Sequence, residues 1–109
     1  MARIDPALRR VRELRKDRAA RDREGAFVAE GIHLASEALA AGATIDLAVV
    51  SPRLGATQGG ADLVARLKCS GIERIETSDT VLASLSDARS PQPVLLVVRA
   101  RRTTLEEAL

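Results

Sequence analysis

The sequence from residue 27 to residue 39 reads FVAEGIHLASEAL and places a strand, a turn and a helix in succession. Residues 26–29 are apolar and typical of a short buried strand, and Glu30-Gly31 is typical of a turn. Apolar residues then recur at the spacing of an amphipathic helix, which Gly42 ends. This order of strand and helix is repeated through the rest of the chain.

Downstream, three more strands are predicted at 45–50, 72–75 and 94–98, and the last of them is the most continuously apolar. A glycine-rich stretch at 55–60 predicts a flexible loop, and helices are predicted around 63–67 and 81–85. Helical segments of about ten residues between strands favour crossover connections. We therefore predict an α/β fold with a small, mostly parallel or mixed four-stranded sheet covered on both faces.

Upstream, residues 5–24 predict one long basic helix. Asp5 is a suitable N-cap, and Pro6 suits the first helical turn. Gly25 suits the left-handed backbone conformation that commonly ends a helix. Apolar residues recur every three or four positions only as far as Leu14. The second half of this helix is therefore expected to lie on the surface.

Charge is unevenly distributed along the chain. Residues 1–24 carry nine arginines and lysines against five acids, a net charge of +4. The whole chain carries only +2, so residues 25–109 sum to −2. The basic end is a candidate contact for a polyanion, and the alternative is a solvated helix with internal ion pairs.

The composition excludes several classes of site. Phe27 is the only aromatic residue, so bases cannot stack on tryptophan or tyrosine. Cys69 and His33 are each the only residue of their type, which excludes an internal disulfide and a four-ligand zinc site of Cys and His. The sequence lacks both an apolar run that could span a membrane and a signal-peptide pattern, and we expect a cytoplasmic protein.

Four phrases in this order resemble the N-terminal substrate-binding domain of SpoU/TrmH-type RNA 2′-O-ribose methyltransferases. They are the arginine-rich segment 12–23, Phe27 to Gly31, Glu37-Ala38-Leu39 with Gly42, and LSDARSPQ at 85–92 before the last strand. The match covers nearly the whole chain. Pro93 departs from the pattern, since the family usually has glycine there, and proline removes a backbone N–H donor.

The resemblance implies a three-layer α/β/α sandwich, similar to that of the kink-turn-binding ribosomal proteins. Kink-turn recognition itself is not expected, because Leu34 and Glu37 fall where those proteins carry polar and basic side chains. Residues 1–98 would form the RNA substrate-binding domain. Residues 99–109 would be a linker and the start of a helix leading to a catalytic domain outside this chain.

We expect the RNA partner to be structured rRNA or tRNA. The RNA-binding residues predicted from the basic helix and from the polar loop before the last strand are Arg9, Arg12, Arg15, Lys16, Arg18, Arg21, Arg23, Ser90 and Gln92. The resemblance implies S-adenosylmethionine in the catalytic domain, so no catalytic, cofactor or metal site is predicted here, and the chain alone is expected to be inactive. The parent enzyme would be a homodimer, and the isolated domain a monomer.

An alternative from a different class is a protein interaction or dimerisation module without direct RNA contact. The apolar residues around Leu105 and Leu109 and the first helix, with its ion pairs, would then face a protein. A free-standing enzyme is the least favoured reading, because no catalytic grouping is visible. Size-exclusion chromatography with light scattering separates the first two hypotheses.

Three single residues have ordinary structural interpretations. His33 is predicted to lie on the surface near a helix start, and Cys69 to be a small buried hydrophobic residue. Glu30 is expected to cap the backbone N–H groups of the following helix, with ligand contact as the alternative.

Overall fold

The computed structural model describes residues 5–86 and 92–100, and the first element begins as the sequence predicts. Asp5 accepts a hydrogen bond from the Ala7 N–H at 2.8 Å, and Pro6 is the first helical residue. The elements in chain order are α1 (Pro6–Lys16), α2 (Arg18–Glu24), β1 (Ala26–Glu30), α3 (Ile32–Ala40), β2 (Ile45–Val50), the 3₁₀ helix η1 (Pro52–Ala56), α4 (Gly60–Cys69), β3 (Arg74–Glu76), α5 (Asp79–Leu85) and β4 (Val94–Arg99).

The strands form one mixed four-stranded sheet in the order β1-β4-β2-β3. β2 and β3 pair in parallel, whereas β4 runs antiparallel to both β1 and β2. Of the two arrangements left open by the sequence, the mostly parallel one is therefore wrong. The connection through α5 starts and ends at the same edge of the sheet, because the Thr77 N–H binds the Val50 carbonyl and the Ser51 N–H binds the Pro93 carbonyl.

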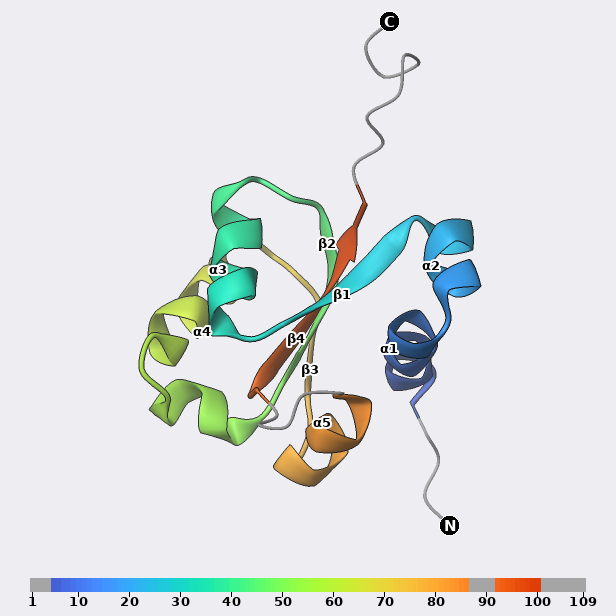
Figure 1. The fold of residues 1–109 in the computed structure, drawn as a ribbon. Helices are drawn as coiled ribbons and strands as arrows, with labels where there is room; N and C mark the ends of the chain where they lie inside the picture. Colours follow the sequence, from blue (N-terminus) through green and yellow to red (C-terminus); the bar gives the residue numbers. More distant parts are fainter. Residues whose placement is uncertain (1–4, 87–91, 101–109) are drawn as a thin grey trace, which may run out of the picture.

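Helices cover both faces of this sheet, which confirms the three-layer architecture (Figure 1). Side chains alternate along β4, so Leu95 and Val97 pack with α1, α2 and α5. Leu96 and its neighbours on the opposite face pack with α3, α4 and η1. β4, which comes last in the sequence, is thus buried in the middle of the fold, and both cores depend on it.

The predicted single helix 5–24 is wrong, because Asp17 divides it into α1 and α2. The backbone of Asp17 is extended, and its carboxylate accepts a hydrogen bond from the Ala19 N–H at 2.9 Å. An aspartate side chain that caps a new helix competes with continuation of the old one. After this break Ala20 of α2 is buried, and it packs in the same core cluster as Val11 and Leu14 of α1.

Other boundaries differ more modestly. The predicted strand 72–75 lies instead at Arg74–Glu76, and the predicted flexible loop 55–60 begins in η1, which buries Leu54. β1 is an edge strand rather than a buried one, and Phe27 is 42% exposed. The prediction for 45–50 is confirmed in full, and Gly25 ends α2 at φ +65°. Across the described residues, no helix is long and apolar enough to cross a membrane.

Candidate nucleic-acid interface

One edge of the sheet gathers the ends of β1, β2 and β3 and the start of β4, and we call it the loop edge. The Gly31 N–H, directly after β1, donates to the Val94 carbonyl at 3.0 Å. The Ser51 N–H, directly after β2, donates to the Pro93 carbonyl at 3.0 Å. The residues that follow β1 and β2 therefore lie beside the segment that enters β4, and Thr77, which follows β3, donates from its N–H to the Val50 carbonyl at 2.9 Å.

Glu30 is the central side chain of the loop edge, with only 10% of it exposed. Its Oε2 accepts a short hydrogen bond from the Ser86 hydroxyl and a weaker one, at 3.4 Å, from the Gln92 N–H. Its Oε1 lies 3.4 Å from Nη2 of Arg15. Glu30 thus connects α1, β1 and both sides of the segment between α5 and β4.

The prediction that Glu30 caps the next helix is therefore wrong. Gly31 is the N-cap of α3 and makes no side-chain cap, and among the described residues the partners of Glu30 are Ser86, Gln92 and Arg15 and not the N–H groups of α3. Gly31 has φ +106°, a backbone conformation that side chains with a Cβ rarely adopt. A Cβ at Gly31 would also lie 3.2 Å from Cγ of Gln92, so the glycine allows Gln92 to pack over the start of α3.

The predicted RNA-binding residues fall into different environments. Gln92 is half-buried at the loop edge, and Ser90 lies outside the described residues. Arg15 is held by Glu30 with 17% of its side chain exposed. Arg21 donates from Nη1 to the carbonyls of Leu14 at 2.7 Å and Arg15 at 3.2 Å, which stabilises the end of α1. Arg15 and Arg21 therefore have structural contacts that the sequence did not indicate.

The remaining predicted cations are less constrained. Arg9, Arg12 and Lys16 are spaced three and four residues apart along α1, so they share one side of that helix. Within the described part of the chain, no carboxylate pairs with any member of this set: Arg9, Arg12, Lys16, Arg18 and Arg23. All of them are exposed except Arg12, which is half-buried. We call these five residues the basic surface.

The acids of the same segment explain why this charge remains uncompensated. Asp5 and Asp17 cap helices, and Glu24 is bound by Arg10 at 2.7 Å. Glu13 on α1 and Asp22 on α2 are exposed and reduce the net charge of this segment, but neither forms an ion pair with another described residue. The alternative of a helix whose charges are compensated by internal ion pairs is therefore wrong for these five cations.

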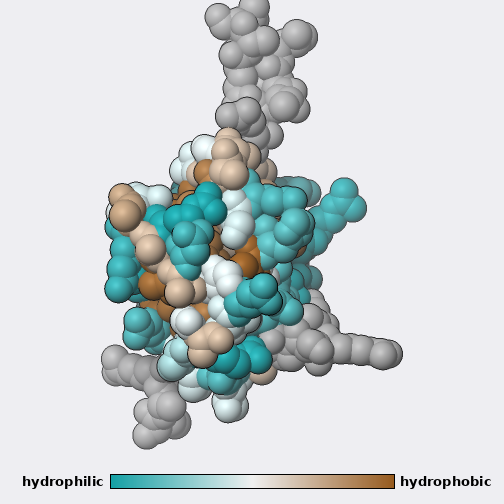
Figure 2. Space-filling view, turned by 90° about the vertical axis from the view of Figure 1, so that its left-hand side faces the viewer, coloured by the Kyte–Doolittle hydropathy of each residue, from teal (hydrophilic) through white to brown (hydrophobic). Residues whose placement is uncertain are grey.

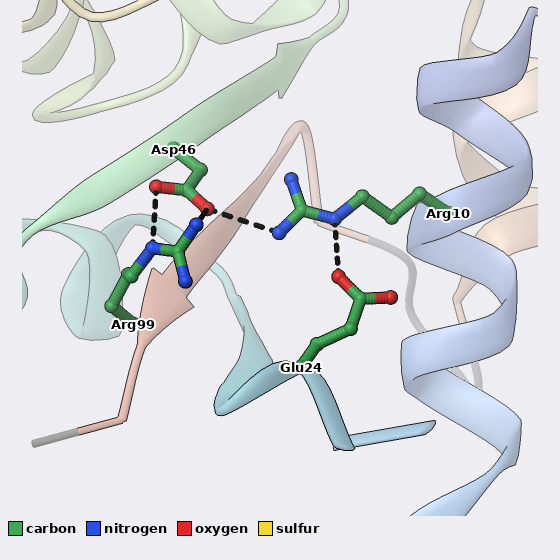
Figure 3. A network of polar contacts seen from close by, with 4 residues as sticks. All are labelled: Arg10, Glu24, Asp46 and Arg99. Atoms are coloured by element: carbon green, nitrogen blue, oxygen red, sulfur yellow. Dashed lines mark hydrogen bonds and ion pairs between the residues drawn. The ribbon is translucent and has the colours of Figure 1, made fainter. Parts of the chain in front are cut away.

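A second cluster of charges has a structural role (Figure 3). Asp46 on β2 accepts from Nη2 of Arg10 at 3.0 Å, and from Nε and Nη2 of Arg99 at 3.2 and 3.0 Å. Burial raises the pKa of Asp46, but the hydrogen bonds from Arg10 and Arg99 outweigh burial, so the pKa lies below its ordinary value. The hydrogen bond to Asp46 raises the pKa of Arg10. This network joins α1 and α2 to the centre of the sheet.

Two further sequence predictions can be compared with the structure. His33 is on the surface as predicted, and its Nε2 lies 3.0 Å from Oε1 of Glu37 one turn later. Cys69 is exposed, so the prediction of a buried residue is wrong. It is the last residue of α4, where the helix extends beyond its buried positions Leu63 and Leu67.

The sequence did not reveal the partners of Glu30 or the polar groups beside β3 that are described below. Ser86 lies within the sequence LSDARSPQ at 85–92, but its contact with Glu30 spans 56 residues. Local spacing carries no signal for such a contact. Only the chain path brings the two side chains together.

Comparison with known proteins identifies relatives of this fold. No curated protein matches the sequence. The structure of an rRNA methyltransferase from Sinorhizobium meliloti is 23% identical with a TM-score of 0.72, over 91% of this chain and 35% of that chain. The SpoU methyltransferase AviRb from Streptomyces viridochromogenes, in complex with AdoMet, is 19% identical with a TM-score of 0.79, over 94% and 38%.

A third structure, described as an RNA 2′-O ribose methyltransferase, is 26% identical with a TM-score of 0.79, over 95% of this chain and 38% of that chain. This chain thus spans little more than a third of the length of these structures. The family of MRM3-like substrate binding domains matches residues 5–96, which include all the elements from α1 into β4. The chain therefore belongs to the MRM3-like substrate binding domain family.

Proposed function

We propose that this chain is the RNA substrate-binding domain of an S-adenosylmethionine-dependent RNA 2′-O-methyltransferase and that it binds structured rRNA or tRNA. The observation that carries the proposal is the basic surface of α1 and α2, whose cations lack acidic partners among the described residues. Unpaired cations on one side of a helix can contact successive phosphates. Family membership and the methyltransferases of similar fold support RNA as the partner.

One observation supports a cofactor site outside this chain. A pocket of about 490 Å³ lies beside Phe27, at the opposite edge of the sheet from the loop edge. Its lining includes Arg99 but no carboxylate to bind the cofactor's amino group, and Arg99 repels a sulfonium cation. We propose that the cofactor, the methyl transfer and the dimer contact of the enzyme belong to residues outside this chain.

The test is RNA binding as a function of salt, measured by filter binding with a structured rRNA fragment. Lys16→Glu and Arg18→Glu should each weaken binding, because each removes a phosphate contact and adds a repulsive charge. Each lost contact should flatten the slope of log K against log salt by roughly 0.7–0.9. Lys68→Glu is the matched control, since Lys68 is equally exposed but lies on α4 in the opposite layer.

Two results would contradict the proposal. One is an absence of affinity for the rRNA fragment at low salt, and the other is an equal loss of affinity in the Lys68→Glu control. A salt-insensitive dimer that does not bind RNA would instead favour the protein interaction module. The face covered by α3 and α4 gives that alternative little support, because its apolar patches are small and separated by hydrophilic ones (Figure 2).

A further inference from the structure

A small pocket of about 200 Å³ lies at the loop edge between β3 and the helices η1 and α4. Its polar lining comes from Ser51, Arg74 and Glu76, and its apolar lining includes Leu54 and Val64. The parallel register pairs Arg74 with Ala48 and therefore turns Arg74 toward the layer of α4. Glu76, two residues later on β3, faces the same way.

The backbone around this pocket is firmly held. Leu54 is 1% exposed, and its carbonyl approaches the start of α4 so closely that a Cβ at Gly60 would lie 1.7 Å from it. The Ser51 N–H binds the Pro93 carbonyl, and the Ser51 carbonyl accepts from the Leu54 N–H. The backbone of Ser51 is thus fully used, and only its hydroxyl remains to bind another group.

Two buried polar atoms, which belong to residues that line this pocket, have no partner among residues 5–86 and 92–100. They are the hydroxyl oxygen of Ser51 and Nη1 of Arg74. Ser51 is 3% exposed, and the described part of the chain offers Arg74 no hydrogen bond or ion pair. Burial of polar groups without partners costs stability, so two of them on residues that line one pocket favour a ligand that would supply the missing partners.

The chemistry of the walls limits what that ligand can be. Arg74 presents donors, and Glu76 presents an acceptor on the same wall, so a phosphate alone would meet a repelling carboxylate. A planar group with an acceptor edge and a donor edge satisfies both side chains. Guanine has this pattern, because O6 and N7 accept from arginine while N1–H and N2–H₂ can donate to a carboxylate.

We propose that the Ser51–Arg74–Glu76 pocket binds one unstacked guanine base of the RNA, with Leu54 and Val64 against the ring. The proposal rests on the proposed function for the source of the base, and it adds base selection to the phosphate contacts of α1 and α2. Bases of unpaired RNA segments are recognised in this way by their hydrogen-bonding edges. The pocket lies at the loop edge, as Glu30 and Gln92 do.

The experiment is an amide NMR titration of the full chain with GMP, AMP and inorganic phosphate in parallel. GMP should shift the signals of Ser51, Val64, Arg74 and Glu76, and AMP and phosphate should shift them much less. Arg74→Gln should abolish the GMP response, and Glu76→Gln should reduce the preference for GMP over AMP. Lys68→Gln on the exposed side of α4 is the matched control. It should leave the GMP response and the preference for GMP over AMP unchanged.

Equal responses to phosphate and GMP would overturn the proposal in favour of an anion site. Equal responses to AMP and GMP, or no response at the pocket, would also overturn it. Ser51→Ala provides a second test if Arg74→Gln does not fold, because it removes one buried hydroxyl with little change in volume. RNA binding that depends on Lys16 and Arg18 while GMP leaves the pocket unchanged would refute this inference alone and leave the proposed function intact.

Discussion

Individual arginines in α1 and α2 have different roles that are set by single neighbours. Arg15 is bound by Glu30, and Arg21 donates to the carbonyls that end α1. Lys16, next to Arg15 in sequence, is exposed and has no acidic partner in the described part of the chain. Residue type alone therefore does not separate the cations that hold the fold from those available to RNA.

Asp46 provides a test at this scale. Replacement by Asn removes the charge that Arg10 and Arg99 share, and we expect a loss of about 1–2 kcal/mol in unfolding free energy at neutral pH. The folded pKa lies below the ordinary value of 3.8, so the ionised carboxylate stabilises the fold fully above pH 3.8. That contribution is lost as the pH falls through the folded pKa.

Urea unfolding followed by circular dichroism, repeated across acidic pH, measures this difference. The difference in unfolding free energy between the wild-type protein and Asp46→Asn should become smaller as the pH falls below 3.8. Asp22→Asn removes an exposed carboxylate of α2 and should change stability little at any pH. A difference in unfolding free energy that stays constant to the lowest pH measured would contradict the assigned role of Asp46.

At the scale of elements, two short segments are positioned by contacts at their ends. η1 carries Leu54 into the core, and α4 begins so close to the Leu54 carbonyl that only glycine fits at position 60. Asp17 ends α1 and starts α2, which places Ala20 in the core. The lengths of these elements are set by close contacts at their ends and not by propensity along their length.

Gly60→Ala should be destabilising for a steric reason. Its Cβ would lie 1.7 Å from the Leu54 carbonyl oxygen, so η1 or α4 must shift, and we expect a loss of about 1–3 kcal/mol. Gly55→Ala is the matched control, because a Cβ there meets nothing within 4 Å and Gly55 does not have a positive φ. Thermal unfolding by circular dichroism compares the two, and equal midpoints would show that the close approach is not a constraint.

At the scale of the whole molecule, β4 joins the two cores. It lies between β1 and β2, and its side chains alternate between the layer of α1, α2 and α5 and the layer of α3 and α4. Because β4 is buried on both faces, the loss of its packing in one core would also disturb the other core. We therefore expect the described residues to unfold in one cooperative transition.

Leu14→Ala in one layer and Leu63→Ala in the other test this coupling. Both leucines are fully buried, and each truncation should cost about 2–5 kcal/mol. Because the chain lacks tryptophan and tyrosine, methyl NMR signals from the two layers are the suitable probes. Both layers should melt at the same urea concentration in each variant, whereas separate midpoints would indicate two independent units.

Leu34→Ala is the control for these truncations, since Leu34 is 48% exposed on α3. We expect its effect to stay within about 0.5 kcal/mol. A loss comparable to that of the buried leucines would mean that Leu34 makes contacts that its exposure does not indicate.

The sequence alone determined the features that depend on neighbouring residues. The Asp5-Pro6 start, the left-handed Gly25 and the strand Ile45–Val50 were predicted correctly, because caps, turn glycines and apolar runs act over a few positions. The ordered phrases also identified the family that the comparison then established. They also predicted that the basic residues lie on the first helical segment, but they did not predict that Asp17 divides this segment into two helices.

Only the tertiary structure decided the direction of β4 in the sheet, the role of Glu30 and the pocket beside β3. Glu30 contacts Ser86 across 56 residues of sequence, and Ser51 and Arg74 line one pocket because β2 and β3 pair in parallel. The physical reason is that hydrogen bonds and burial between distant residues depend on the path of the chain. Periodicity reports which face of an element is apolar, but not which element will cover it.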